Sequence, residues 1–380
     1  MHYRILMMSS LPLSAPWNGA DKNFGRLIAQ TDIENEYIVQ TGAGDDWPDH
    51  VTPVRSAHVE SMPTRAQKIF AFRYLLRYAG KSDLVHIVAS LSNPSRPGTA
   101  LLRGWHKIAH KPVVHTLPSI GDIPVVRSNF VGDVTVVVSK HSQQKLKDHG
   151  IPNVLHIYPP LDVSKIFPTN PPEQLSKELA LGQNAVLYPA HYGTKSGIKE
   201  VIAAFSHLPT SLRDAVLVLA CRTHPGQNAD DEARQVLTYG RKMGIAERIR
   251  IVGDFKDIPA LISACSITVL VPNQLTSKMD LPLVVLESLA LKRPVILSEQ
   301  PPLDEALLGG GGFTVPYGNI PALAAAMSKL LTDQVLYERL ATQGYNAVRQ
   351  QCHPDRITEQ YREIYHSLME TKEQQFRKFF

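Results

Sequence analysis

The chain has 380 residues, of which 43% are hydrophobic and 20% charged, and this length and composition support two medium-sized domains rather than one. A formal net charge of +5 fits phosphate-bearing substrates or an anionic membrane surface, but it does not indicate a nucleic-acid-binding protein. The three cysteines form no close pair and no CxxC motif, which indicates a reducing cytoplasm and argues against a zinc site.

The N-terminus, MHYRILMMSSLPL, lacks a basic region followed by a long apolar core, so it predicts a first strand rather than a signal peptide. Short β-branched runs then alternate with helical patterns, which predicts an α/β fold with doubly wound parallel sheets. No apolar run is long enough to span a bilayer. The predicted strands are 3–10, 36–41, 84–90, 111–117, 134–139, 154–160, 185–190, 215–220, 248–253, 267–272, 294–298 and 313–317.

A proline-rich break at 159–183 shows no clear periodicity and is expected to be an interdomain linker. Two open α/β domains facing each other place the carboxyl ends of their strands around a cleft, where such folds bind ligands. The predicted organisation is an N-terminal domain at 1–160, a linker at 161–182, a C-terminal domain at 183–354 and a charged helix at 355–380 that crosses towards the N-terminal domain.

The turn after the first strand, SLPLSAPWNGADKNFGRLIA, is a candidate ligand loop. Gly19 and Gly25 allow a close approach of the backbone, and Lys22 and Arg26 add positive charge. The turn is not GxGxxG, so a Rossmann dinucleotide site is unsupported. A ligand-facing loop and a plain strand-to-helix turn both fit these residues.

The segment 64–81, TRAQKIFAFRYLLRYAGK, predicts a basic amphipathic helix. One face is expected to carry Ile69, Phe72, Leu75 and Leu76, with arginine and lysine on the other faces. Such a helix could rest on anionic lipid, or pack on the core with a solvated basic side.

The loop after Ala190, HYGTKSGIKEVIAAF, leads from the first strand of the second domain into a helix. Gly193 and Gly197 permit tight turns. His191, Lys195 and Lys199 bring positive charge to the start of that helix, which suits a diphosphate. A surface loop with solvated lysines is the other interpretation.

The segment TSKMDLPLVVLESLALKRPV at 276–295 predicts a loop, a helix that opens at Pro282 and a turn into a buried strand. The amides of Leu283 and Val284 then have no partner within the helix and can bind an anion. Glu287 lies about one turn further on, where a carboxylate can accept hydrogen bonds from sugar hydroxyls. Together these groups form a plausible cradle for a nucleotide sugar, although an ordinary amphipathic helix with a solvated glutamate also fits.

Three other patterns are expected to be structural. The run GGGG at 309–312 lacks the Lys-Ser/Thr of a phosphate loop and is expected to lead into a strand. His86 and His115 lie at the ends of buried strands, where core histidines are common. No H-E-x-x-H spacing and no G-x-S-x-G elbow occurs, so neither a metal site nor a serine hydrolase is expected.

From 185 to 365 the sequence resembles the large family four of retaining glycosyltransferases, the group 1 glycosyltransferases with the two-domain GT-B fold. The four family patterns "lyvGr...KGi..li.Af..l", "drV.flG.v....l..ly..adv.vlPS", "EGFPLVVLEAMACGkPVV" and "G.lV.pgd..aLa.ai..ll" are similar to VLYPAHYGTKSGIKEVIAAFSHL, ERIRIVGDFKDIPALISACSITVLVPN, MDLPLVVLESLALKRPVI and GFTVPYGNIPALAAAMSKLL. They occur in the family's order and at its spacing.

Several family positions differ in this chain. In the family's E-x7-E motif the first Glu falls on Met279, beside Asp280, and the second is kept as Glu287, which in the family binds the nucleotide ribose. The donor-phosphate Arg falls on His191. The remaining departures are the family's Lys at Ser196, its active-site His at Pro118, and its interdomain PnGvD, which is PPLD at 159–162.

The resemblance implies a cytoplasmic retaining glycosyltransferase, in contact with the inner face of the membrane or free of it. It would move a sugar from a nucleoside diphosphate sugar to a hydroxyl of a glycan, a lipid-linked sugar or a small metabolite, with no metal and no cofactor. Asp280 is the candidate sugar-facing catalytic residue. The candidate donor-binding residues are Gly19, His191, Lys195, Lys278, Leu283, Val284 and Glu287. A non-catalytic GT-B protein that assists a partner, and a GT-B phosphorylase or epimerase, are the alternatives.

Overall fold

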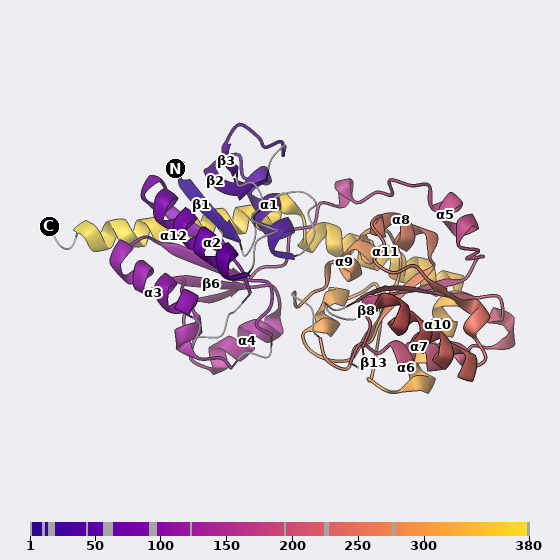
Figure 1. The fold of residues 1–380 in the computed structure, drawn as a ribbon. Helices are drawn as coiled ribbons and strands as arrows, with labels where there is room; N and C mark the ends of the chain where they lie inside the picture. Colours follow the sequence, from indigo (N-terminus) through magenta and orange to yellow (C-terminus); the bar gives the residue numbers. More distant parts are fainter. Residues whose placement is uncertain are drawn as a thin grey trace. The chain divides into compact units, whose positions relative to one another are not determined.

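The computed structural model describes residues 2–9, 12–13, 20–42, 45–55, 64–90, 97–121, 124–193, 195–223, 228–275 and 279–377. They form two compact units, each built on one parallel sheet with helices on both faces (Figure 1). Unit 1 comprises Met1–Leu161, Ser277–Asp280 and Cys352–Phe380, and unit 2 comprises Asp162–Thr276 and Leu281–Gln351. The predicted fold class, two doubly wound parallel-sheet α/β domains, is confirmed. In the described ranges no helix combines the length and apolarity needed to cross a bilayer.

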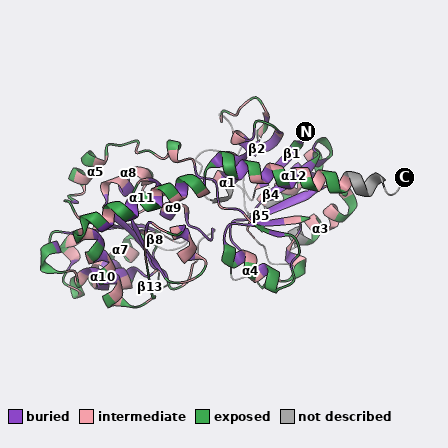
Figure 2. Cartoon of the chain, turned by 180° about the vertical axis from the view of Figure 1, so that it is seen from behind, coloured by how far each residue is buried: buried purple, intermediate pink, exposed green. Residues whose placement is uncertain are grey.

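The sheet of unit 1 has seven parallel strands in the order β3-β2-β1-β4-β5-β6-β7. The strands are β1 (Arg4–Ser9), β2 (Glu36–Thr41), β3 (Val51–Arg55), β4 (Leu84–Val88), β5 (Val113–Leu117), β6 (Val134–Val137) and β7 (Val154–His156). The helices are α1 (Ala20–Thr31), α2 (Thr64–Tyr78), α3 (Pro97–Ala109), α4 (Lys140–Asp148) and α12 (Pro354–Arg377). The central strands are buried because both faces of the sheet are covered (Figure 2).

The strand β3 was not predicted from the sequence. Its residues VTPVR contain a proline, which cannot donate a hydrogen bond to a sheet and therefore argues against a central strand. The structure accommodates Pro53 because β3 is the edge strand and pairs only with β2, where Pro53 lies opposite Val39. An edge strand with a proline in its middle is therefore difficult to recognise from its own residues.

Helix α2 covers part of one sheet face, but not with the side predicted for it. Leu75 and Tyr74 are buried against the sheet, whereas Ile69 and Leu76 are 63% and 55% exposed. The prediction grouped apolar residues by helical spacing alone. It was wrong for Ile69 and Leu76 because apolar residues occur on both sides of this helix, and only packing against the strands decides which side is buried.

Helix α12 lies on the opposite face of the sheet, against α1 (Figures 1 and 2). Two of its tyrosines reach the strands. The Tyr365 hydroxyl lies 2.7 Å from Nδ1 of His86, and the Tyr361 hydroxyl lies 2.8 Å from Oγ1 of Thr116. Thr116 Oγ1 is in turn 2.8 Å from Nε2 of His86. Burial lowers the pKa of His86 to about 3 and that of His115 to about 4, so both are neutral core residues.

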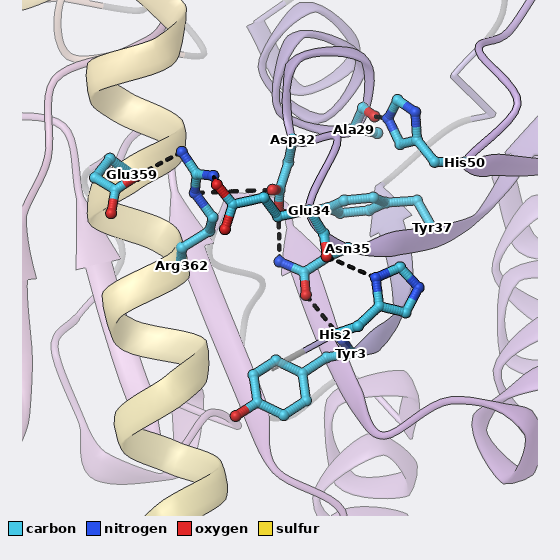
Figure 3. Close-up of polar contacts among 10 residues, drawn as sticks. All are labelled: His2, Tyr3, Ala29, Asp32, Glu34, Asn35, Tyr37, His50, Glu359 and Arg362. Carbon is cyan, nitrogen blue, oxygen red and sulfur yellow. Dashed lines mark hydrogen bonds and ion pairs between the residues drawn. The ribbon is translucent and has the colours of Figure 1, made fainter.

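A second set of polar contacts joins α12 to the segment between α1 and β2 (Figure 3). The guanidinium of Arg362 forms ion pairs with Glu34 and, at 2.5 Å, with Glu359. Its Nε also lies 3.9 Å from Oδ1 of the fully buried Asp32. The other carboxyl oxygen of Asp32 accepts hydrogen bonds from Tyr37 at 2.6 Å and Asn35 at 2.9 Å. Arg362 therefore supplies positive charge beside a buried carboxyl group.

We expect Arg362→Gln to lower the free energy of unfolding by about 2–3 kcal/mol, because a buried carboxyl group then loses its neighbouring cation. Arg349→Gln, at an exposed position outside this contact, is the matched control and should change it by less than about 0.5 kcal/mol. Urea denaturation of the two variants measures both values. Equal stability of the two variants would show that the Arg362 contacts contribute nothing.

The sheet of unit 2 has six parallel strands in the order β10-β9-β8-β11-β12-β13. The strands are β8 (Ala185–His191), β9 (Val216–Arg222), β10 (Ile249–Ile251), β11 (Ile267–Leu270), β12 (Val295–Ser298) and β13 (Gly312–Val315). The helices are α5 (Pro172–Glu178), α6 (Ile198–Ser206), α7 (Ala229–Lys242), α8 (Ile258–Ala264), α9 (Leu283–Ala290), α10 (Ile320–Thr332) and α11 (Gln334–Gln351). Apolar clusters lie on both faces of this sheet.

The segment predicted to be a linker, 161–182, contains ordered structure from its first residues. Helix α5 begins at a proline and buries Leu175 in the same cluster as α8. Asp257, which caps α8, also accepts hydrogen bonds from the backbone amides of Thr169 and Asn170. The absence of clear periodicity therefore reflected a short helix and a well-bonded loop rather than a structureless connection.

The glycine run at 309–312 leads into β13 by close backbone contacts. A Cβ on Gly312 would lie 1.9 Å from the carbonyl oxygen of Val295, and Gly311 has φ of +85°. Only glycine fits such positions without displacing the neighbouring strand. This run serves strand packing, as expected from the missing Lys-Ser/Thr.

Candidate functional site

The carboxyl edge of the unit 2 sheet has the topology of a ligand site. The chain passes from β8 outwards to β9 and β10 and then returns to place β11 on the other side of β8. At such a reversal the loops after two neighbouring strands turn in opposite directions and leave a crevice at the carboxyl ends. The loops after β8 and β11 are the two that the sequence singled out.

The start of α9 lies immediately after β11 and is open at its N-terminus. Pro282 occupies the N-cap position with φ of −60°, and it offers no side-chain oxygen to the first turn. The amide of Val285 bonds to the carbonyl of Pro282 at 3.0 Å. In the part of the chain that the structure describes, no hydrogen bond from the amides of Leu283 or Val284 is found. These two N–H groups can therefore serve an anion.

Glu287 lies one turn into α9 and is half-buried. Burial raises the pKa of its carboxyl group to about 7, and the nearby Arg222 opposes that shift. Arg222 ends β9, and its Nε donates to Oδ1 of Asp254 at 2.8 Å, so its charge is shared with another carboxylate. Among the described residues the Glu287 carboxyl group forms no hydrogen bond or ion pair. A half-buried carboxyl group in this state is suited to accept hydrogen bonds from a ligand.

The loop after β8 is held against the segment that follows β11. A Cβ on Gly197 would lie 2.0 Å from the carbonyl oxygen of Val271, and φ at Gly197 is +85°. The amide of Asn273 donates to the carbonyl of Lys195 at 2.9 Å. The exposed amine of Lys195 donates to Gln274 Oε1 at 2.7 Å. The geometry thus places a lysine amine beside the chain segment that leads to α9.

Two further positions in this loop have different roles. His191 is the last residue of β8, is exposed, and pairs in register with Arg222 at the same sheet edge. Ser196, where the resemblance would place a lysine, braces the turn instead. Its hydroxyl donates to the carbonyl of Gly193 at 2.7 Å, and its own carbonyl accepts from the hydroxyl of Tyr188.

Asp280 lies with unit 1 and is 2% exposed. Its Oδ2 accepts hydrogen bonds from the hydroxyls of Ser139, at 2.7 Å, and Ser142, at 2.5 Å. Its amide donates to the carbonyl of Pro118 at 2.8 Å. Burial raises the pKa of Asp280, and hydrogen bonds from serines, including Ser119, oppose the rise. Asp280 does not cap α9. Its hydrogen bonds to the serines favour a role in fixing residues 279–280. Contact of Asp280 with a sugar stays a prediction.

Gly19 and Lys278 lie outside the described residues. Sequence reasoning missed Arg222, Asp254 and the serines around Asp280. An arginine directly after a buried apolar run at the carboxyl edge of a parallel sheet was the available signal for Arg222. The serines had no such signal, since Ser139 and Asp280 are brought together only by the fold.

In the described residues no cluster of three or more His, Cys, Asp or Glu is arranged to hold a metal ion.

Residues 172–347 match the model of the family Glycosyl transferases group 1. This range contains every described candidate donor-binding residue. The chain is also similar to an alpha-D-kanosaminyltransferase from Streptomyces kanamyceticus, with 29% identity over 161 residues. That alignment covers 41% of this chain and only 38% of the relative.

Solved structures share the fold over nearly the whole chain. The Anabaena protein HepE, solved in complex with UDP-glucose, superposes with a TM-score of 0.70 at 17% identity, covering 96% of this chain and 100% of that one. Sucrose-phosphate synthase from Thermosynechococcus elongatus gives a TM-score of 0.71 at 18% identity, covering 97% and 99%. The chain therefore has the GT-B fold.

The raised pKa of Glu287 predicts a specific dependence of stability on pH. In the native state the Glu287 carboxyl group keeps its proton up to about pH 7, whereas in the unfolded chain it loses the proton near pH 4.5. The free energy of unfolding therefore falls as the pH rises between these two values. Glu287→Gln is neutral at every pH and should be more stable than the parent at about pH 8, by no more than about 3 kcal/mol. The two should converge near pH 4.5.

Urea denaturation at about pH 5 and about pH 8 measures this difference. Glu173→Gln, at an exposed position of unit 2, is the control and should show no such dependence. Parallel pH curves for the parent and Glu287→Gln would mean that the Glu287 carboxyl group is not desolvated.

Proposed function

We propose that this protein is a glycosyltransferase that moves a sugar from a nucleoside diphosphate sugar to an acceptor hydroxyl, with retention of configuration. The observation that carries the proposal is the carboxyl edge of unit 2. There, among the residues that the structure describes, the first two amides of α9 have no partner, and the half-buried carboxyl group of Glu287 has none one turn later. The family match at 172–347 and the kanosaminyltransferase relative support glycosyl transfer. The complex of HepE with UDP-glucose supports a nucleotide-sugar donor.

Each group in this edge has a distinct task in the proposed reaction. The Glu287 carboxylate accepts hydrogen bonds from the hydroxyls of the nucleotide ribose. The amides of Leu283 and Val284 and the amine of Lys195 bind the diphosphate, and His191 lies at the same edge. Such donors stabilise the negative charge that grows on the departing diphosphate in the transition state. Gly19 and Lys278 are proposed as further donor contacts.

The chemistry requires no metal ion or cofactor in this proposal, because protein amides and cations take the place of a metal on the diphosphate. Retention is proposed to proceed by attack of the acceptor on the same face of the sugar, without a protein nucleophile. The acceptor is a hydroxyl of a glycan, a lipid-linked sugar or a small metabolite. The three cysteines are buried thiols, which favours a reducing cytoplasm as the place of reaction.

Binding of a nucleoside and of its diphosphate distinguishes the proposed role of Lys195, which binds the diphosphate, from that of Glu287, which binds the ribose. Lys195→Ala should weaken binding of a nucleoside diphosphate roughly tenfold to a hundredfold and leave nucleoside binding unchanged, because a charge-assisted hydrogen bond contributes about 1.5–3 kcal/mol. Glu287→Gln should weaken nucleoside and nucleoside diphosphate by the same factor. Calorimetry with uridine and UDP, and with the matching guanosine pair, measures these ratios.

Lys242→Ala is the matched control, because Lys242 is an exposed lysine of the same unit at the end of α7 and should leave diphosphate affinity unchanged. Full diphosphate affinity in Lys195→Ala, or selective loss of diphosphate affinity in Glu287→Gln, would contradict the assignment of these groups.

Asp280→Asn tests whether Asp280 takes part in catalysis. If its carboxylate contacts the sugar in the transition state, the variant should lose more than about tenfold in kcat with donor affinity and thermal stability unchanged. The serine contacts in the structure make us expect the other outcome, a lowered melting temperature with kcat nearly retained. Turnover with the best-binding donor and a panel of acceptors, including water, is the measurement.

A second candidate function is binding of a nucleotide or glycan without catalysis, as a partner of another enzyme. The buried Met279 favours it, because the first glutamate of the family motif is replaced there by an apolar side chain. Donor binding by the parent without transfer to any acceptor or to water would support this second function over the first.

A further inference from the structure

One face of the unit 1 sheet is covered by α2 and α3, which lie side by side (Figure 1). Leu75 of α2 is buried in an apolar cluster with strands β1, β2, β4 and β5. Leu102 and Trp105 of α3 pack against the same cluster. Because both helices turn these residues to one sheet face, their opposite sides point away from the sheet in a common direction.

The outward sides of the two helices carry large apolar side chains. Ile69 and Leu76 on α2 are 63% and 55% exposed, and Leu101 and Ile108 on α3 are 54% and 81% exposed. These four are almost half of the nine strongly exposed large hydrophobic residues among those the structure describes. A single exposed leucine is ordinary, but a group of four on two adjacent helices indicates a surface that contacts an apolar partner.

The same two segments carry a concentrated positive charge. Residues 64–81 contain five arginines and lysines, residues 97–111 contain three, and neither segment contains Asp or Glu. The formal charge of these segments, +8, exceeds the +5 of the whole chain, so the rest of the protein is net negative. Arg73, Arg77, Lys81 and Lys107 are exposed beside the apolar residues.

Neighbouring groups adjoin this surface. The Arg103 guanidinium donates to the carbonyl of Ser128 at 2.6 Å and so holds the 3-10 turn Arg127–Asn129 beside α3. The residue before that turn, Val126, is 42% exposed. Of the carboxylates near these helices, Asp83 accepts from the amide of Arg4, at 2.8 Å. Asp133 accepts from the amide of Val113, at 2.8 Å, and its Oδ2 also lies 3.2 Å from Nε2 of His106 on α3. Among the described residues neither carboxylate forms an ion pair with the arginines and lysines of α2 and α3.

We propose that the outward faces of α2 and α3 dock this protein on an anionic lipid bilayer. Aliphatic side chains flanked by arginine and lysine match the interface of a membrane, where the side chains enter the acyl boundary and the cations meet lipid phosphates. Nucleic acid fits less well, because a strand would be gripped by exposed aromatic rings rather than by leucine and isoleucine. The proposal does not depend on glycosyl transfer.

Sedimentation of the full-length protein with vesicles tests the proposal without donor or acceptor. One vesicle preparation is phosphatidylcholine alone, and the other contains about one third phosphatidylglycerol. We expect binding to the anionic vesicles, weak binding to the neutral ones, and a steep loss of binding as salt is raised.

Two variants separate charge from apolar contact. Arg73→Gln/Arg77→Gln/Lys107→Gln should lose roughly a hundredfold in partition, since each cation near an anionic surface contributes roughly fivefold. Leu76→Ser/Ile108→Ser should lose about tenfold or more, on vesicles of either composition. All five positions are exposed, so the variants should fold, and their melting temperatures verify this.

Matched controls change the same residue types elsewhere. Arg213→Gln/Lys242→Gln/Lys256→Gln removes three exposed cations from unit 2, and Ile33→Ser/Val335→Ser removes two exposed apolar side chains. Both controls should bind vesicles like the parent. The proposal is overturned if the parent does not sediment with anionic vesicles, if the controls lose as much binding as the α2–α3 variants, or if single-stranded RNA displaces the protein from the vesicles.

Discussion

The contact between Gly197 and the carbonyl oxygen of Val271 determines how the candidate site in unit 2 is built. An added Cβ would lie 2.0 Å from that oxygen, so the turn after β8 can pass there only without a side chain. The contact seats Lys195 beside the segment after β11 and lets α6 begin at Ile198 with its apolar side on the sheet. The position of a cation beside the segment after β11 thus follows from backbone packing rather than from an ion pair.

The charged groups at the carboxyl edge of unit 2 do not neutralise Glu287, so a ligand can bind to it. Arg222 could neutralise Glu287, but its guanidinium is already hydrogen-bonded to Asp254. The Glu287 carboxyl group is consequently half-buried with little compensation, and its pKa of about 7 records that cost. Ribose hydroxyls would replace lost water as hydrogen-bond donors to this group. Burying a carboxyl group without a partner destabilises the fold, and in the described part of the chain Glu287 does so at the place where the proposed function needs a hydrogen-bond acceptor.

Local patterns predicted most of the parallel strands, because most are short apolar runs rich in β-branched residues. They predicted the start of α9 because a proline suits the first turn of a helix. They failed where long-range packing decides. Pro53 is tolerated only because β3 ends the sheet, and Ile69 is exposed only because Leu75 faces the strands. The partners of Asp280 lie far away in the sequence, so no window of residues could show that its carboxylate would meet serines.

The place of α12 in unit 1 has a consequence for synthesis of the chain. Tyr361 and Tyr365 complete hydrogen bonds with Thr116 and His86, yet the ribosome makes them only after all of unit 2. Until then one face of the sheet in unit 1 is covered by α1 without α12, and His86 lacks its phenol partner. Unit 2 comprises Asp162–Gln351 except for Ser277–Asp280, which belongs to unit 1, so it can fold first. The domain made first on the ribosome is therefore the one finished last.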